Sequence, residues 1–177
     1  ENNVFATPTF PFNISKINCK KGSKPYYQML CNYHFSKTSG QLKWEQVFNK
    51  EIQQSEWLNI NLLAKHCTQS VNMKWFHYKI IQNILTTNIF LYKIGYIDSA
   101  LCSICKQEPE SIIHILCECT YSSRVWKELS EWLGRLQEGI IDFNAENIIL
   151  GFKGRNNNPL NIVCLIVKQN IYKMNRK

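Results

Sequence analysis

Apolar residues recur every three or four positions along most of the chain, which is the spacing of amphipathic helices. The clearest repeat lies between Ser122 and Gln137 and uses Val125, Trp126, Leu129, Trp132, Leu133 and Leu136. Lys74–Leu85 is the most apolar segment, so we predict that it lies at the centre of the core. Strand-like alternation is weak throughout. The pattern therefore predicts a mainly α protein, a small helical domain.

Capping and breaking residues divide the rest of the chain. Pro8 and Pro11 lie in a segment of little periodicity, 1–22, which we predict to be an extended basic arm. Ser23 and Pro25 are typical of a helix start, and residues 38–40 (Thr-Ser-Gly) of a break after that helix. We predict four further helices: one at 42–52, one from a Ser55 cap to Cys67, one from a cap within 86–88 to Gly95, and one that begins at Pro159. A short helical turn is predicted at 144–151.

Composition indicates a globular protein, because hydrophobic residues make up 45% and charged residues 19% of the 177 positions. We find no signal peptide and no apolar run long enough to span a membrane, so we expect an intracellular protein with reduced thiols and no membrane partner. The chain begins Glu-Asn-Asn without Met, and we expect it to be a piece of something longer.

The stretch LCSICKQEPESIIHILCEC holds four of the eight cysteines and one of the four histidines. Cys102 and Cys105 form a C-x2-C pair, which lets a tight turn aim two thiolates at one ion. Zinc sites commonly leave three to five residues inside the second ligand pair, a spacing that His114 and Cys119 satisfy. Cys117 lies too close to His114, and we interpret it as a small apolar helix residue. The predicted ligands are Cys102, Cys105, His114 and Cys119.

The residues between the two ligand pairs predict a turn followed by a helix. Residues 108–111 (Glu-Pro-Glu-Ser) combine breaking and capping side chains, and Ile112, Ile113 and Leu116 supply an apolar face. Four protein ligands leave no open coordination position, so one zinc ion would be structural and would contribute folding free energy. We therefore expect an embedded Cys-Cys-His-Cys zinc turn-helix module at 98–121, after a helical region at 23–97 and before C-terminal helices at 122–177 that pack on the same domain.

Two other interpretations of the cysteines remain open. The cluster also suits simple buried thiols, and eight cysteines permit a disulfide framework by parity, although no signal peptide is present and the other cysteines are widely spread. The remaining histidines, His34, His66 and His77, lie among apolar neighbours and are interpreted as ordinary helix residues.

Net charge is +8, and the basic residues lie mainly at the two ends of the chain. Clustered lysine and arginine side chains favour phosphate binding. Tyr26 and Tyr172 are candidates to stack on unpaired bases. The candidate nucleic-acid-binding residues are Lys16, Lys20, Lys21, Lys24, Lys153, Arg155, Lys168, Lys173, Arg176 and Lys177.

No catalytic residue is predicted. Polymerase chemistry requires paired carboxylates that hold two metal ions, but the only aspartates are Asp98 and Asp142, in different segments. We find no glycine-rich phosphate loop and no nucleophile elbow.

Several motifs together resemble the zinc-binding region of non-LTR (LINE-type) retrotransposon reverse transcriptases. They are K-W-F-x-Y-x-I, I-L-T-T-N-x-x-L-x-K-I-G, and S-x-x-C-x-x-C-x8-H-x-L-x-x-C followed by Trp126. The resemblance runs from about Ser23 to the closing V-K-Q-N-I-Y-K. The four predicted ligands match those of the family one for one. This chain departs from the family in having Cys117 where a bulky apolar residue is usual and no glycine after Cys105.

The resemblance implies a non-catalytic region of an RNA-directed DNA polymerase. It would help hold RNA template or target DNA during target-primed reverse transcription, beside the upstream polymerase of the same polyprotein, and this would require access to the nucleus. The alternative is a zinc-braced docking module that makes protein contacts and does not bind nucleic acid.

Overall fold

The computed structural model describes residues 37–136, 141–154 and 157–176. Within these ranges the chain is mostly helical and contains no strand, apart from one isolated antiparallel bridge between Leu101 and Pro109. The predicted mainly α class is therefore confirmed. The predicted arm at 1–22 and nearly all of the helix that would begin at Ser23 lie outside the described residues. None of the described helices is both long and apolar enough to cross a membrane.

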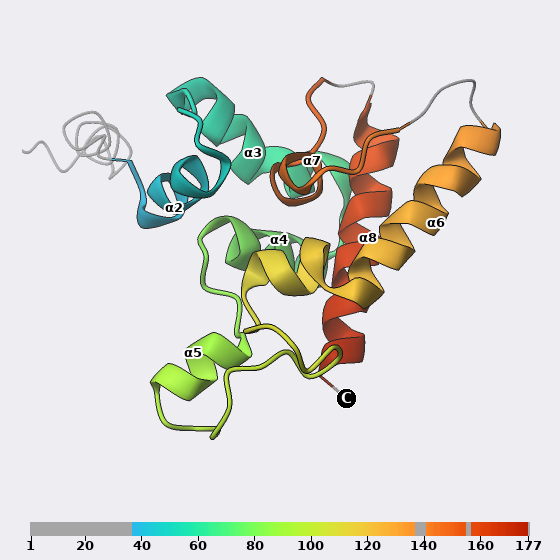
Figure 1. The fold of residues 1–177 in the computed structure, drawn as a ribbon. Coiled ribbons are helices and arrows are strands. Elements are labelled where there is room, and N and C mark those ends of the chain that lie inside the picture. Colours follow the sequence, from blue (N-terminus) through green and yellow to red (C-terminus); the bar gives the residue numbers. More distant parts are fainter. Residues whose placement is uncertain (1–36, 137–140, 155–156, 177) are drawn as a thin grey trace, which may run out of the picture. The chain divides into compact units, whose positions relative to one another are not determined.

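The helices follow one another along the chain, and Figure 1 labels the α-helices. They are α2 (Ser39–Phe48), α3 (Gln54–Cys67), α4 (Val71–Ile81), α5 (Asn88–Lys93), the π-helix η3 (His114–Glu118), α6 (Thr120–Leu136), α7 (Ala145–Leu150) and α8 (Asn158–Asn175).

Helix α2 begins where the sequence predicted a break. The Thr38 hydroxyl accepts a hydrogen bond from the Gln41 backbone N–H at 3.2 Å, so Thr38 is the N-cap. Gly40 lies in the first turn against the carbonyl oxygen of Ile81. The Trp44 indole N–H donates to the same carbonyl at 2.9 Å. The glycine is needed because α2 approaches the end of α4 too closely for a Cβ.

The predicted helix that ends at Cys67 is present, but Ser55 does not cap it. The helix begins at Gln54, two residues earlier than a Ser55 cap would place it, and the side chain of its N-cap Gln53 makes no capping hydrogen bond. The predicted cap within 86–88, the predicted short turn at 144–151 and the predicted helix start at Pro159 are all present. Thr87 caps α5, Asn144 caps α7 and Pro159 lies in the first turn of α8.

Helix α4 is central, as its apolar sequence predicted, although it ends at Ile81 and not at Leu85. Its buried residues include Ile80 and His77. The His77 Nε2 lies 2.8 Å from the Ile60 carbonyl oxygen, while its buried Nδ1 has no hydrogen-bond partner among the described residues. His77 does not belong to the cluster of possible metal ligands. Burial lowers the pKa of His77 to about 3, which keeps its ring neutral.

Helix α8 packs against three other helices, α3, α4 and η3 (Figure 1). Helix α6 contacts η3, and α7 contacts both η3 and α4. The core therefore forms around α4, η3 and α8. Its fully covered apolar side chains include Ile80, Ile81, Ile115, Leu116, Ile149 and Leu165.

Candidate metal centre

The first ligand pair lies in a tight loop closed by backbone hydrogen bonds. The Cys102 N–H donates to the Glu108 carbonyl oxygen at 2.8 Å, and the Lys106 N–H donates to that of Cys102 at 2.9 Å. Lys106 has a φ of 55°, in the left-handed region. This turn directs the side chains of Cys102 and Cys105 toward one point. Glycine adopts this left-handed backbone conformation without steric cost, so a glycine would suit the position after Cys105, where this chain has Lys106.

The second pair is positioned by the π-helix η3. Ser111 caps the preceding turn, because its hydroxyl accepts from the His114 N–H at 3.0 Å. The Cys119 N–H then donates to the His114 carbonyl oxygen at 2.7 Å, an i→i+5 bond. In this wider helix five residues make little more than one turn, so His114 and Cys119 lie on the same side. An α-helical register would turn one of them away.

Side chains of α6 satisfy the carbonyl groups at the end of η3. Ser122 donates to the Ile115 carbonyl, and the Trp126 indole N–H donates to that of Leu116 at 2.7 Å. The Trp126 ring also stacks on Phe143, with ring centroids 5.4 Å apart. The start of α6 therefore fixes the irregular helix end that carries Cys119.

The structure brings the four predicted ligands together. One ligand atom from each of Cys102, Cys105, His114 and Cys119 lies within 4.8 Å of the others. The Cys102 and Cys119 sulfurs are 3.9 Å apart, and the Cys105 sulfur is 3.3 Å from the His114 Nε2. Zn–S and Zn–N bonds of about 2.3 and 2.1 Å in a tetrahedron place ligand atoms roughly 3.5–3.8 Å apart. The cluster therefore fits a metal ion of zinc size with three sulfur ligands and one nitrogen ligand.

The two thiols of the loop differ in electrostatic environment. Burial raises the pKa of Cys102 to about 11. The backbone N–H groups of Gln107 and Glu108 point at Cys105 and lower its pKa to about 6. Cys105 is also less covered than Cys102, beside a cavity of about 250 Å³ that His114 also lines. Cys105 is thus a thiolate at neutral pH, whereas Cys102 must release a proton to bind a metal.

Cys117 lies outside the cluster. It packs against the hydrophobic core, and burial raises its pKa to about 12. The described cysteines, Cys67, Cys102, Cys105, Cys117, Cys119 and Cys164, are all free thiols. Within the described ranges the disulfide interpretation is therefore not supported.

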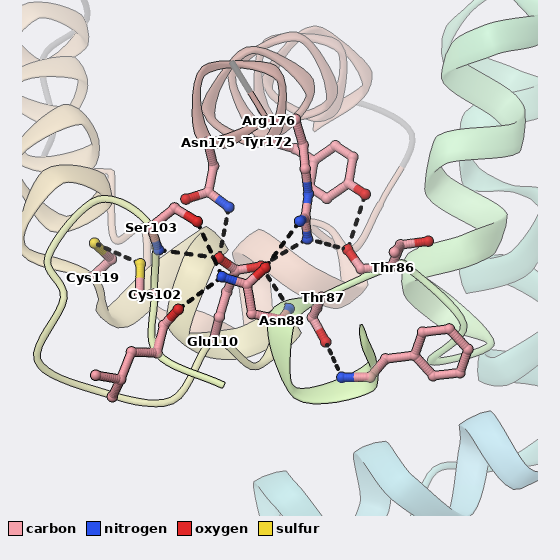
Figure 2. Close-up of polar contacts among 12 residues, drawn as sticks. Thr86, Thr87, Asn88, Cys102, Ser103, Glu110, Cys119, Tyr172, Asn175 and Arg176 are labelled. Atoms are coloured by element: carbon pink, nitrogen blue, oxygen red, sulfur yellow. Dashed lines mark hydrogen bonds and ion pairs between the residues drawn. The ribbon is translucent and has the colours of Figure 1, made fainter. Parts of the chain in front are cut away.

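A buried carboxylate fixes the metal loop to the rest of the fold (Figure 2). Glu110 has no exposed surface. Its Oε1 accepts from the Asn88 backbone N–H at 2.9 Å and from the Arg176 guanidinium at 2.7 Å. Its Oε2 accepts from the Asn175 side chain at 2.8 Å and from the Ser103 N–H at 3.4 Å. One carboxylate thus joins the metal loop, the start of α5 and the end of α8.

Asn88 adds a second connection between α5 and the loop. Its side-chain amide donates to the Leu101 carbonyl oxygen at 2.7 Å and to the Ser103 hydroxyl at 3.0 Å, on either side of Cys102. Arg176 also donates to Asn88 Oδ1 at 3.1 Å and to the Thr86 carbonyl oxygen at 2.6 Å. Sequence reasoning assigned Glu110 only to a turn and did not identify this network.

The structure corrects part of the predicted nucleic-acid surface. Lys168 is only 1% exposed and donates to the Ile148 carbonyl oxygen at 2.6 Å, so it is not available to bind a phosphate. Arg176 is held by Glu110, and Tyr172 is half-buried with its hydroxyl hydrogen-bonded to the Thr86 carbonyl oxygen at 2.9 Å.

The other candidate residues are exposed or lie outside the described ranges. Lys153 is 67% exposed and pairs with Glu56 at 2.9 Å, and Lys173 is exposed. Those outside the described residues are Lys16, Lys20, Lys21, Lys24, Arg155, Lys177 and the aromatic Tyr26.

The fold and the cluster together define a helical protein with a Cys-Cys-His-Cys group suited to a metal ion. A family model described as zinc-binding in reverse transcriptase matches residues 35–126, which is more than half of the chain and includes all four clustered residues and Trp126. The chain therefore belongs to this family of zinc-binding regions of reverse transcriptases. The matched region is a zinc-binding region and not a catalytic domain. No curated protein and no solved structure matches the chain.

Proposed function

We propose that this chain is the zinc-binding module of a non-LTR (LINE-type) reverse transcriptase, and that Cys102, Cys105, His114 and Cys119 hold one structural zinc ion. The observation that carries the proposal is the convergence of the four ligand atoms within 4.8 Å. Three of these residues are at most 6% exposed, and a set of four leaves no position for a reacting water. Zinc bound there would stabilise the fold and would not take part in polymerase chemistry.

The module would help the parent RNA-directed DNA polymerase hold its RNA template or target DNA during target-primed reverse transcription. The net charge of +8 supports this role, since cationic side chains release counterions when they contact phosphates. Copying at chromosomal DNA would take place in the nucleus. The described module would bind and position nucleic acid, and the catalytic carboxylates would come from the upstream polymerase.

The alternative is a docking module with no direct contact to nucleic acid. The network around Glu110 favours it, because this carboxylate connects the metal loop to α5 and α8 and uses Arg176 for internal binding. A zinc ion would then brace a rigid helical surface for the upstream polymerase.

Metal analysis of the purified, reduced chain tests the zinc site. We expect one zinc per chain in the wild type and in Cys117→Ser, and loss of zinc in Cys119→Ser. The Cys117→Ser variant is the matched control, because it makes the same chemical change two residues away on a side chain that packs against the core. Retention of full zinc by Cys119→Ser, or absence of zinc from the wild type, would contradict the proposed ligand set.

Binding to labelled oligonucleotides at several salt concentrations tests the nucleic-acid role. We expect the logarithm of the affinity to fall linearly with that of the salt concentration, with a slope of about −0.7 for each phosphate contact to a single strand. Binding to the polymerase part alone, insensitive to salt and without any oligonucleotide affinity, would reject this role in favour of docking.

A further inference from the structure

Helix α4 has one buried face and one exposed aromatic face. The buried face contains Phe76, His77, Ile80 and Ile81. On the opposite side Val71, Trp75 and Tyr78 are 64%, 58% and 46% exposed. The Trp75 and Tyr78 rings contact each other edge to face, with centroids 5.5 Å apart. Two adjacent large rings are therefore available on a helix whose other side is fixed in the core.

A lysine accompanies the aromatic pair. Lys79 is exposed and follows Trp75 by four positions, so both side chains lie on the same helix face. The helix rises about 1.5 Å per residue, which places their Cα atoms about 6 Å apart along the axis. A ring that stacks on a base and an ammonium group that pairs with a neighbouring phosphate are thus offered side by side.

The charge of the surrounding sequence distinguishes this face from an ordinary apolar contact surface. No Asp or Glu occurs between Glu56 and Asp98, a span that carries Lys65, Lys74, Lys79 and Lys93. The span also holds α5 and the turn after it, whose exposed residues include Phe90, Tyr92 and Tyr96 at 51%, 53% and 76%. Aromatic rings in a segment free of acidic residues are complementary to a polyanion with exposed bases.

Trp132 on α6 provides the contrast within the same molecule. It is 52% exposed, close to the value for Trp75, but Glu128 and Glu131 are exposed on the same helix. The same helix also exposes Arg124, Lys127 and Arg135, so acidic and basic side chains are mixed around Trp132, whereas the span around Trp75 holds no acidic residue. Exposure of a tryptophan alone therefore does not define the surface.

We propose that the exposed face of α4, formed by Val71, Trp75, Tyr78 and Lys79, binds single-stranded nucleic acid. Unpaired bases stack on Trp75 and Tyr78, and Lys79 contacts the adjoining phosphate. A single strand is the expected ligand because bases inside a duplex already stack on each other and cannot reach these rings. The inference rests on the proposed function and assigns its binding surface to residues of α4, whereas the basic sequence pattern had indicated residues near the two ends of the sequence.

The test uses the full zinc-loaded chain and a fluorescein-labelled single-stranded RNA and DNA of about 12 nucleotides each, within the usual range of site sizes. We expect Trp75→Ala to weaken binding by roughly 5- to 150-fold, the effect of losing one base-stacking contact. Trp132→Ala, the matched control, is expected to leave the affinity unchanged. Lys79→Gln is expected to reduce the magnitude of the salt slope by about 0.7.

The outcomes separate this inference from the proposed function. If the wild type binds neither oligonucleotide at low salt, the proposed nucleic-acid role fails and this inference fails with it. If the wild type binds but Trp75→Ala and Trp132→Ala both match it, the α4 face is overturned while the nucleic-acid role stands. The wild type could also prove to be a dimer that Trp75→Ala converts to a monomer while the oligonucleotide affinity stays unchanged. That result would assign the face to self-association and overturn the inference. Because Trp75 is largely exposed, its removal is expected to leave the circular dichroism spectrum unchanged.

Discussion

Replacing Glu110 by glutamine should destabilise the protein strongly although the two side chains have nearly the same shape. The Glu110 carboxylate is fully buried and accepts hydrogen bonds from Asn88, Asn175 and Arg176 at 2.7–2.9 Å. Glutamine keeps one acceptor oxygen, but its NH₂ group would face donors, and the guanidinium would lose its counter-charge. Removing one partner of a buried ion pair costs about 3–5 kcal/mol. Because the Arg176 side chain is 26% exposed and can gain water, we expect about 3 kcal/mol.

Urea unfolding at a fixed free zinc concentration measures this cost, since bound metal adds to apparent stability. With an m value of about 2 kcal/mol/M, a loss of 3 kcal/mol lowers the midpoint by about 1.5 M. Glu108→Gln is the matched control, because it removes the same charge from an exposed side chain of the same loop and is expected to shift the midpoint little. Equal midpoints for the two variants would refute the assigned role of the Glu110 network.

Three further predictions test buried contacts in other parts of the described fold. Gly40→Ala, normally stabilising in a helix, should destabilise by about 1–3 kcal/mol in thermal unfolding, because its Cβ would overlap the carbonyl oxygen of Ile81. Trp126→Phe should cost about 1–3 kcal/mol in urea unfolding, since it leaves the Leu116 carbonyl without its donor; no loss would contradict this role. His77 has a folded pKa of about 3, below its unfolded value of about 6.5, so its contribution to stability is present above pH 6.5 and decreases by about 1.4 kcal/mol per pH unit below it. The wild type should therefore lose more stability than His77→Gln between pH 6.5 and pH 5.

Features set by neighbouring residues could be predicted from the sequence. The Thr87 cap acts on a backbone group three residues away, so its effect is visible in a short window of sequence. The four clustered residues could be found for the same reason, since the turn after Cys102 and the five-residue step from His114 to Cys119 are both local. The five-residue spacing of His114 and Cys119 was also the one sequence feature that indicated a π-helix, because an i→i+5 hydrogen bond brings residues at this spacing to the same side of the helix.

Features set by distant residues could not be predicted. Gly40 resembled a helix breaker, and only the approach of Ile81 explains its position inside a helix. Lys168 belonged to a basic C-terminal pattern, but the packing of α8 against α3, α4 and η3 buries it. Three of the donors that hold Glu110 come from Asn88, Asn175 and Arg176, which are 22 to 66 positions away, and no spacing rule connects them.

The position of the Glu110 network implies that the metal site and the helical core are coupled. The hydrogen bonds of Glu110 and Asn88 end on Ser103 and Leu101, the two neighbours of Cys102. These contacts constrain the backbone on both sides of Cys102, and such constraint reduces the ordering cost of metal binding. By the same linkage, a bound ion that orders Cys102 also orders the residues that contact α5 and Arg176. Loss of zinc should therefore loosen the start of α5 and the end of α8 as well as the loop.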